Sequence, residues 1–280
     1  MIGPIPISEI KKLAPMPVST VKLCTMISDP NTSIAQIARV VELDPALTAN
    51  TLRMANSAWS SPRMPIVTVR EAVVRLGTAR ILGLAVAKQV EGKMSKQIPG
   101  YQLGEHELWR HSVAAALTVF NLNKYVKKHI PSVAFTAALL HDIGKLLLAR
   151  YLKPESIQKI QDKITNEKVT YLDAEREVIG TDHAEVGGVI AEYWQFPEEL
   201  VTAIRCHHQI LENPDIILDA VSIGNIVAKL VGVGLGSEQM NMKVDSELYI
   251  RLGLKINDLE SLCARVKSEL IEAEELFGSN

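Results

Sequence analysis

The residues best suited to chemistry lie in the second half of the chain. The strongest candidates are His141 and Asp142, which interrupt an apolar run between Ala137 and Leu147 and are followed by Lys145. Polar side chains inside a buried segment cost free energy unless they are hydrogen-bonded or bound to a cation. An imidazole nitrogen beside a carboxylate oxygen offers two metal ligands. The sequence therefore predicts a cation site at this pair.

Further candidate ligands occur on both sides of the pair. Glu107 and His111 are four residues apart and would project from one helix face. Other histidines begin or end helical patterns, and the last apolar helix carries two polar residues that could serve as a terminal oxygen ligand. These later candidates are His183, His207, His208 and Asn225, with Asp219 as the alternative to Asn225. Packed helices commonly build metal sites from inward-pointing histidines and carboxylates.

Each candidate also has a simpler interpretation. His111 taken alone suits a core histidine with one hydrogen-bond partner, and the pair at 207–208 suits a helix C-terminus. Glu107 and Lys145 taken alone suit solvated charges. Cys206 suits a small core residue rather than a ligand. The whole set could be hydrogen-bonded core without a metal, and His106 and His129 fall outside the pattern.

The elements that must position these side chains are helices. Apolar residues recur at three- and four-residue spacing, alternating patterns are few, and aromatic residues make up 5% of the chain. Capping boxes at Ser33–Gln36 and Thr68–Glu71, and Asp44 before a proline, mark helix starts. We expect an all-α fold with helices near 18–28, 34–42, 46–56, 68–76, 79–92, 105–126, 132–140, 142–152, 155–167, 171–180, 183–195, 198–208, 216–231 and 257–277.

Composition excludes several functional classes. A formal charge of −2 and the lack of long basic runs argue against a nucleic-acid surface. Residues 34–56 could form a helix-turn-helix, but the second helix would carry only Arg53, and short helix pairs in a bundle give the same pattern. Three dispersed cysteines predict neither disulfides nor a zinc ribbon. No run of 18 apolar residues and no signal peptide are apparent, so we expect a soluble cytoplasmic protein.

In combination, these motifs resemble a known superfamily. His111, the His141–Asp142 pair and the later histidines are similar to the HD superfamily of metal-dependent phosphohydrolases. The first half resembles one branch of it, the HDOD domain (HD-related output domain) of bacterial signalling proteins. The resemblance covers roughly residues 8–235, and the first-half motifs that carry it are Leu13–Pro17, Asp44–Thr48 and Ala55–Ser57.

This resemblance implies an organisation for the chain. It predicts an N-terminal helical part at residues 1–95, an HD-like helical core at 104–235 and a C-terminal helical extension at 236–280. It also implies a role in bacterial signal transduction, through contacts with signalling proteins. One or two divalent ions, Fe, Mn, Zn or Ni, would be bound by Glu107, His111, His141, Asp142, His183, His207, His208 and Asn225.

The alternative implied by the same resemblance is an active metal-dependent phosphohydrolase acting on a nucleotide or cyclic dinucleotide. Asp142 would bridge two ions that activate water, and Lys145 would contact the phosphate. Two positions depart from the HD-GYP phosphodiesterases. Asn225 stands where that group has an aspartate, and residues 209–211 replace its Glu and Gly-Tyr-Pro segment. These departures favour the regulatory role.

Overall fold

The computed structural model of the chain describes residues 10, 15–57, 60, 62, 64–241 and 245–277. Within these residues the secondary structure is helical, apart from one isolated antiparallel bridge between Ile98 and Leu103. The all-α prediction is confirmed. Among the same residues, no helix combines the length and apolar character needed to cross a bilayer. Leu13 and Ala14 of the first-half motif lie outside the described residues.

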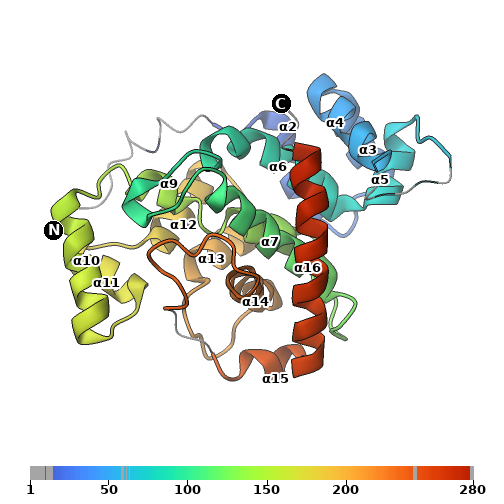
Figure 1. Ribbon diagram of the computed structural model, residues 1–280. Coiled ribbons are helices and arrows are strands. Elements are labelled where there is room, and N and C mark those ends of the chain that lie inside the picture. The colour runs from blue at the N-terminus through green and yellow to red at the C-terminus, as the bar shows by residue number, and fades with distance from the viewer. Residues whose placement is uncertain are drawn as a thin grey trace.

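The N-terminal helices form one end of the molecule (Figure 1). Their starts follow the predicted chemistry: Ser33 and Thr68 each form a capping box, and the Asp44 carboxylate accepts a hydrogen bond from the backbone N–H of Leu47 at 3.0 Å. The helices are α2 (Val18–Ser28), α3 (Ile34–Glu42), α4 (Pro45–Ala55), α5 (Val69–Leu76) and α6 (Thr78–Met94).

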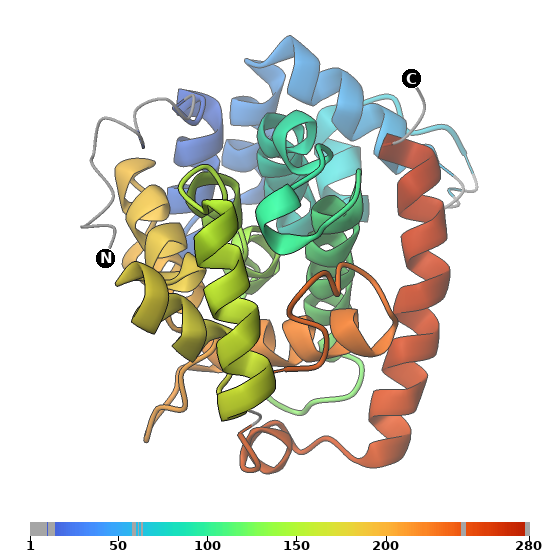
Figure 2. The same cartoon turned by 60° about the vertical axis from the view of Figure 1, so that its left-hand side comes forward.

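A short 3-10 helix, η1 (Pro99–Tyr101), connects α6 to the second series of helices. This series is longer and ends with a helix that runs along one side of the molecule (Figure 2). Its members are α7 (Glu107–Leu122), α8 (Val133–Leu140), α9 (Gly144–Leu148), α10 (Pro154–Glu167), α11 (Tyr171–Ile179), α12 (His183–Tyr193), α13 (Glu198–Cys206), α14 (Ile216–Leu230), α15 (Leu248–Leu252) and α16 (Ile256–Phe277).

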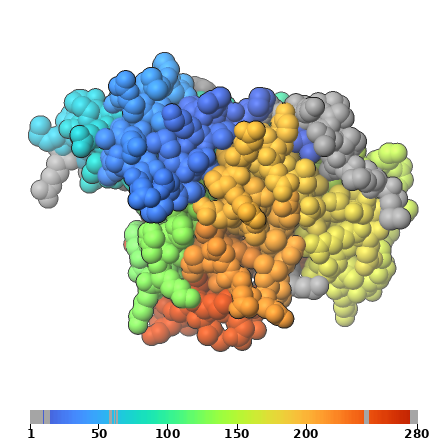
Figure 3. Space-filling model, turned by 180° about the vertical axis from the view of Figure 1, so that it is seen from behind, coloured from blue at the N-terminus to red at the C-terminus, as the bar shows by residue number. Residues whose placement is uncertain are grey.

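The core is centred on α7, which packs against α8, α14 and α16. Beside it, α12 packs against both α9 and α13. Buried side chains of the N-terminal helices and of the second series belong to one hydrophobic cluster, and α6 contacts α2 on one side and α8 on the other. From behind, the blue N-terminal helices and the gold segment of α12 and α13 form one continuous surface (Figure 3).

Some elements differ from expectation. The helix expected at 142–152 is the single short helix α9, because residues 141–143 form a turn that separates it from α8. The helix expected to reach residue 126 ends at Leu122. The five-residue α15 was not expected, since it is only slightly longer than one turn before Gly253 ends it with φ of 69°.

Candidate metal centre

Six of the candidate residues meet in the core in two groups that share Asp142. In each group, one possible ligand atom from every residue lies within 4.8 Å of the others. All six are at least largely buried, with His208 the most exposed. The first group contains Asp142, His183, His207 and His208, and the second contains His111, His141 and Asp142. Helix α7, the turn before α9, the start of α12 and the end of α13 supply them.

A close contact between two helices brings the His141–Asp142 turn to His183. Gly144 begins α9 so near to α12 that an added Cβ atom would lie 1.9 Å from the backbone oxygen of His183 and 2.7 Å from the nitrogen of Gly187. Only glycine fits there. The start of α12 is fixed by its N-cap, Asp182, whose carboxylate accepts hydrogen bonds from the N–H groups of residues 184 and 185 at 2.8 and 2.9 Å.

His141 and His207 are held in the same way. In each, Nδ1 lies 2.7 Å from the backbone oxygen three residues earlier, that of Ala138 or Ile204. Nδ1 must donate to this carbonyl, so Nε2 carries the lone pair. Both Nε2 atoms are buried and make no hydrogen bond, and the same is true of Oδ1 of Asp142. The Nε2 atoms lie 3.4 Å and 3.7 Å from the Asp142 carboxylate.

This arrangement suits a cation. Lone pairs of neutral imidazoles that face a buried carboxylate repel it unless a proton or a metal lies between them. Burial lowers the pKa of His207 to about 4, so this ring is neutral near pH 7 and the proton is absent. Two imidazole nitrogens and a carboxylate oxygen without partners therefore fit the donor set of a divalent transition metal.

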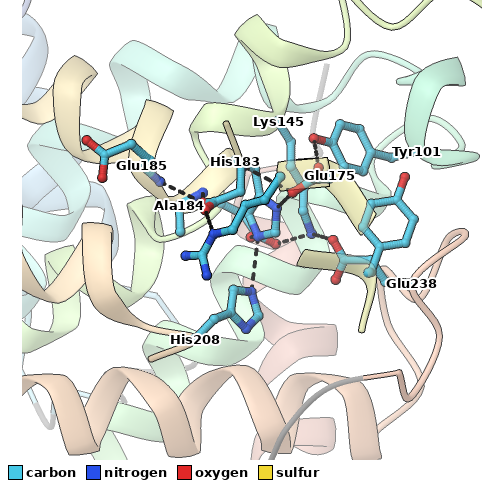
Figure 4. Close-up of polar contacts among 12 residues, drawn as sticks. Tyr101, Lys145, Glu175, His183, Ala184, Glu185, His208 and Glu238 are labelled. Atoms are coloured by element: carbon cyan, nitrogen blue, oxygen red, sulfur yellow. Dashed lines mark hydrogen bonds and ion pairs between the residues drawn. The ribbon is translucent and has the colours of Figure 1, made fainter. Parts of the chain in front are cut away.

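His183 is oriented by a residue that the sequence did not reveal. Its Nδ1 lies 2.7 Å from Oε2 of Glu175, which is fully buried, and the hydroxyl of Tyr101 donates to the other oxygen of Glu175 at 2.5 Å (Figure 4). Burial lowers the pKa of His183, but the Glu175 carboxylate outweighs it, so the pKa is raised overall. Nε2 is thereby directed at Nε2 of His208, 3.0 Å away.

His111 belongs to the second group. Its Nδ1 is 3.0 Å from the oxygen of Val233, and its Nε2 is 3.1 Å from Oδ1 of Asn225 and 3.6 Å from Oδ2 of Asp142. Burial lowers the pKa of His111 to about 3, which keeps the ring neutral. The amide oxygen of Asn225 therefore lies beside the lone pair of His111 at the edge of the second group.

Two other candidates lie apart from the cluster. Glu107 is half-buried and accepts a hydrogen bond from the backbone N–H of Gly104 at 2.8 Å, and it belongs to neither group. Asp219, the alternative to Asn225, is bound by Arg251 through two hydrogen bonds of 2.6 and 3.0 Å. Its carboxylate therefore pairs with a residue of α15 and is not part of the cluster.

Lys145 lies beside the cluster and is itself buried. Its Nζ lies 2.8 Å from Oδ2 of Asp142 and 2.6 Å from Oε1 of Glu238. Burial alone would lower the pKa of Lys145, but the two carboxylates raise it above its ordinary value. The carboxyl of Asp142 is also buried, yet the charged Lys145 beside it helps to hold its pKa well below the usual range. Lys145 is thus charged. After Glu175, Glu238 is the second residue near the cluster that the sequence analysis did not identify.

A pocket of about 430 Å³ leads from the surface to the cluster. It reaches His183 and His208 from the first group, and Glu238 also lines it. The half-exposed guanidinium of Arg176 lies in the wall, next to Asp182. A small molecule in this pocket would contact the cluster from the side of His183 and His208.

The chain is similar in sequence to a known domain family and to a bacterial protein. The family described as the HDOD domain matches residues 13–210. An uncharacterized protein of Treponema pallidum (strain Nichols) is 22% identical over 210 residues, which are 74% of this chain and 40% of that protein. The chain thus matches less than half the length of this relative.

Solved structures show the same fold. An HDOD domain protein of unknown function from Geobacter sulfurreducens is 23% identical, with a TM-score of 0.68 and coverage of 96% of this chain and 97% of that one. A protein of Marinobacter aquaeolei VT8 proposed to act in signal transduction is 21% identical, with a TM-score of 0.75 and coverage of 98% and 65%. A proposed phosphohydrolase from Shewanella amazonensis SB2B is 23% identical, with a TM-score of 0.64 and coverage of 97% and 96%.

Proposed function

Because the chain belongs to the HDOD domain family, we propose that it is a bacterial regulatory protein of signal transduction whose helical core binds one or two divalent metal ions. One observation carries the metal-binding part: the buried Nε2 atoms of His141 and His207 and Oδ1 of Asp142 face one another without hydrogen bonds. The signalling part is supported by the family and by the similar Marinobacter protein. Its partners would be cytoplasmic signalling proteins.

If two ions are bound, the candidate ligands would divide between them and Asp142 would belong to both sets. His183, His207 and His208 would hold one ion with Asp142, and His111 and His141 would hold a second with the other side of that carboxylate. Asn225 would offer its amide oxygen to the second ion, because Oδ1 lies 3.1 Å from Nε2 of His111. Mixed imidazole and carboxylate donors suit Fe, Mn, Zn or Ni.

Metal binding is tested on protein purified without chelator. We expect one or two equivalents of a transition metal by elemental analysis, and a large loss of metal in His141→Ala and Asp142→Ala. His129→Ala is the matched control, because it removes an exposed histidine outside the cluster. Folded variants of residues 141 and 142 that retain all their metal would contradict the proposal.

A second candidate function is a metal-dependent phosphohydrolase. The observation that favours it is the 430 Å³ pocket, which brings a small molecule to His183 and His208. Lys145 would balance negative charge on a phosphoryl group, and Asp142 would fix both Lys145 and the ligands. A divalent ion at such a site supplies Lewis acidity and an activated water.

Hydrolysis assays separate the two functions. The metal-loaded protein is incubated with a panel of nucleotides and cyclic dinucleotides with added Mn²⁺ or Fe²⁺. Stoichiometric metal without turnover supports the regulatory function. Turnover that His141→Ala and Asp142→Ala abolish, and that His129→Ala retains, would establish the enzyme instead.

A further inference from the structure

Two buried lysines share a single carboxylate beside the candidate metal centre. Nζ of Lys145 lies 2.6 Å from Oε1 of Glu238, and Nζ of Lys229 lies 3.0 Å from Oε2. All three side chains are nearly inaccessible, at 3%, 2% and 4% exposure. The carboxylate therefore bridges two ammonium groups that α9 and α14 bring together from different parts of the chain.

The bridge is needed for electrostatic reasons. Two buried ammonium groups near each other are costly without an anion between them. Lys145 has a second carboxylate, that of Asp142, at 2.8 Å. Among the described residues, Glu238 is the only carboxylate within ion-pair distance of Lys229. The lysine pair therefore has a strong preference for an anion at the position of Glu238.

Glu238 stands between this lysine pair and the pocket. It lines the 430 Å³ pocket together with His183 and His208, and Figure 4 shows it beside Lys145. The backbone on either side is anchored: the N–H of Ser237 donates to the oxygen of Tyr101 at 2.8 Å, and Oδ1 of Asn241 accepts from the N–H of Tyr171 at 2.6 Å. The segment that carries Glu238 is thus held in place between the lysine pair and the pocket.

We propose that Lys145 and Lys229 form a binding site for the phosphate group of an anionic ligand, and that the Glu238 carboxylate occupies this site when no ligand is bound. A carboxylate and a phosphate accept charge-assisted hydrogen bonds from the same donors, and a phosphate carries more charge. The ligand would reach the site through the pocket. This inference deepens the proposed function by naming a ligand class, but the lysine pair itself requires no metal.

The test compares phosphate binding by variants in the presence of EDTA. Inorganic phosphate is titrated by calorimetry into the wild-type chain and into Glu238→Ala, at an ionic strength kept constant with chloride. We expect Glu238→Ala to bind phosphate at least about tenfold more tightly than the wild type, because the internal competitor is gone. In the double variant Glu238→Ala/Lys229→Met, we expect the increase in phosphate affinity to be lost. If Glu238→Ala does not fold, Glu238→Gln removes the charge at nearly constant volume and replaces it in the same comparison.

Glu177→Ala is the matched control, because it removes an exposed carboxylate that pairs with Lys163 at 2.5 Å. It should bind phosphate no better than the wild type. Equal affinities of the Glu238 variant and the wild type would overturn the proposal, and so would a gain that survives Lys229→Met. Because no metal is present, a wild-type protein that fails to bind metal would contradict the proposed function and leave this result unaffected.

Discussion

At the scale of residues, four of the five clustered histidines are oriented through the ring nitrogen that faces away from the cluster. Nδ1 of His111, His141 and His207 lies at a backbone oxygen, whereas Nδ1 of His183 lies at the carboxylate of Glu175. Such partners fix the tautomer of a metal ligand and raise its basicity. A charged partner does this more strongly than a carbonyl, so His183 should be the strongest donor of its group.

We expect Glu175→Gln to weaken metal binding about 10- to 100-fold, because the neutral amide no longer enhances the basicity of His183. The measurement is a competition between the protein and a chelator of known affinity. Glu177→Gln is the control, since it lies on the same helix and is exposed. Equal affinities of Glu175→Gln and the wild type would show that Glu175 has no influence on the ligand.

The sequence pointed to His141 and Asp142 because they interrupt an apolar run, and to the other clustered histidines by their spacing and their positions at helix ends. Glu175 gave no such signal, since it lies among Asp173, Arg176 and Glu177 and looks like part of a solvated face. Its burial depends on Tyr101, a residue 74 positions earlier. Glu107 was linked to His111 by spacing alone. Spacing cannot show that the Glu107 carboxylate instead accepts a hydrogen bond from the backbone N–H of Gly104.

At the scale of elements, the contact between α9 and α12 sets the geometry of the centre. Gly144 makes this contact possible, because its missing side chain lets the backbone of α9 meet that of α12. The close approach of the His141–Asp142 turn to His183 therefore depends on this one glycine.

Gly144→Ala should destabilise the protein by about 3 kcal/mol, since the added methyl group would overlap backbone atoms that cannot move aside easily. Gly92→Ala is the matched control within helix α6, where an added Cβ meets no atom within 4 Å. It should stabilise the protein by about 0.5–1 kcal/mol. The measurement is urea unfolding of both variants, and a Gly144→Ala protein as stable as the wild type would contradict the role given to this contact.

Helix positions were predictable where side-chain chemistry marks their ends. The caps at Ser33, Asp44 and Thr68 are present as expected, because each depends only on neighbouring residues. The short α9 was not predicted, since apolar residues stand on both sides of the turn at residues 141–143 and the sequence there does not mark a helix end. Which helices pack together depends on contacts distant in sequence, and local patterns do not encode these.

At the scale of the whole molecule, the centre makes the metal-free protein sensitive to acid. The unfolded chain binds protons on its histidines below about pH 6.5, whereas His111 and His207, with pKa values of about 3 and about 4, stay neutral in the folded chain. The unfolded state therefore gains protons first, and stability falls as the pH decreases from about 6.5 to about 4. The raised pKa of His183 opposes part of this loss.

We expect the urea midpoint in EDTA to be clearly lower at about pH 5 than at about pH 7.5, with up to about 1.4 kcal/mol lost per pH unit for each of the two histidines. His129→Ala should show the same loss, because His129 is exposed. A midpoint that does not change with pH would mean that these rings are not neutral in the folded protein.

The family match ends at residue 210, yet side chains beyond it complete the surroundings of the centre. Asn225 contacts His111, and Glu238 pairs with both Lys145 and Lys229. Substitutions confined to this later stretch would therefore change the charge around Lys145 while every clustered histidine is retained. The part of the chain that the family shares and the part that sets the electrostatics around the centre can vary separately.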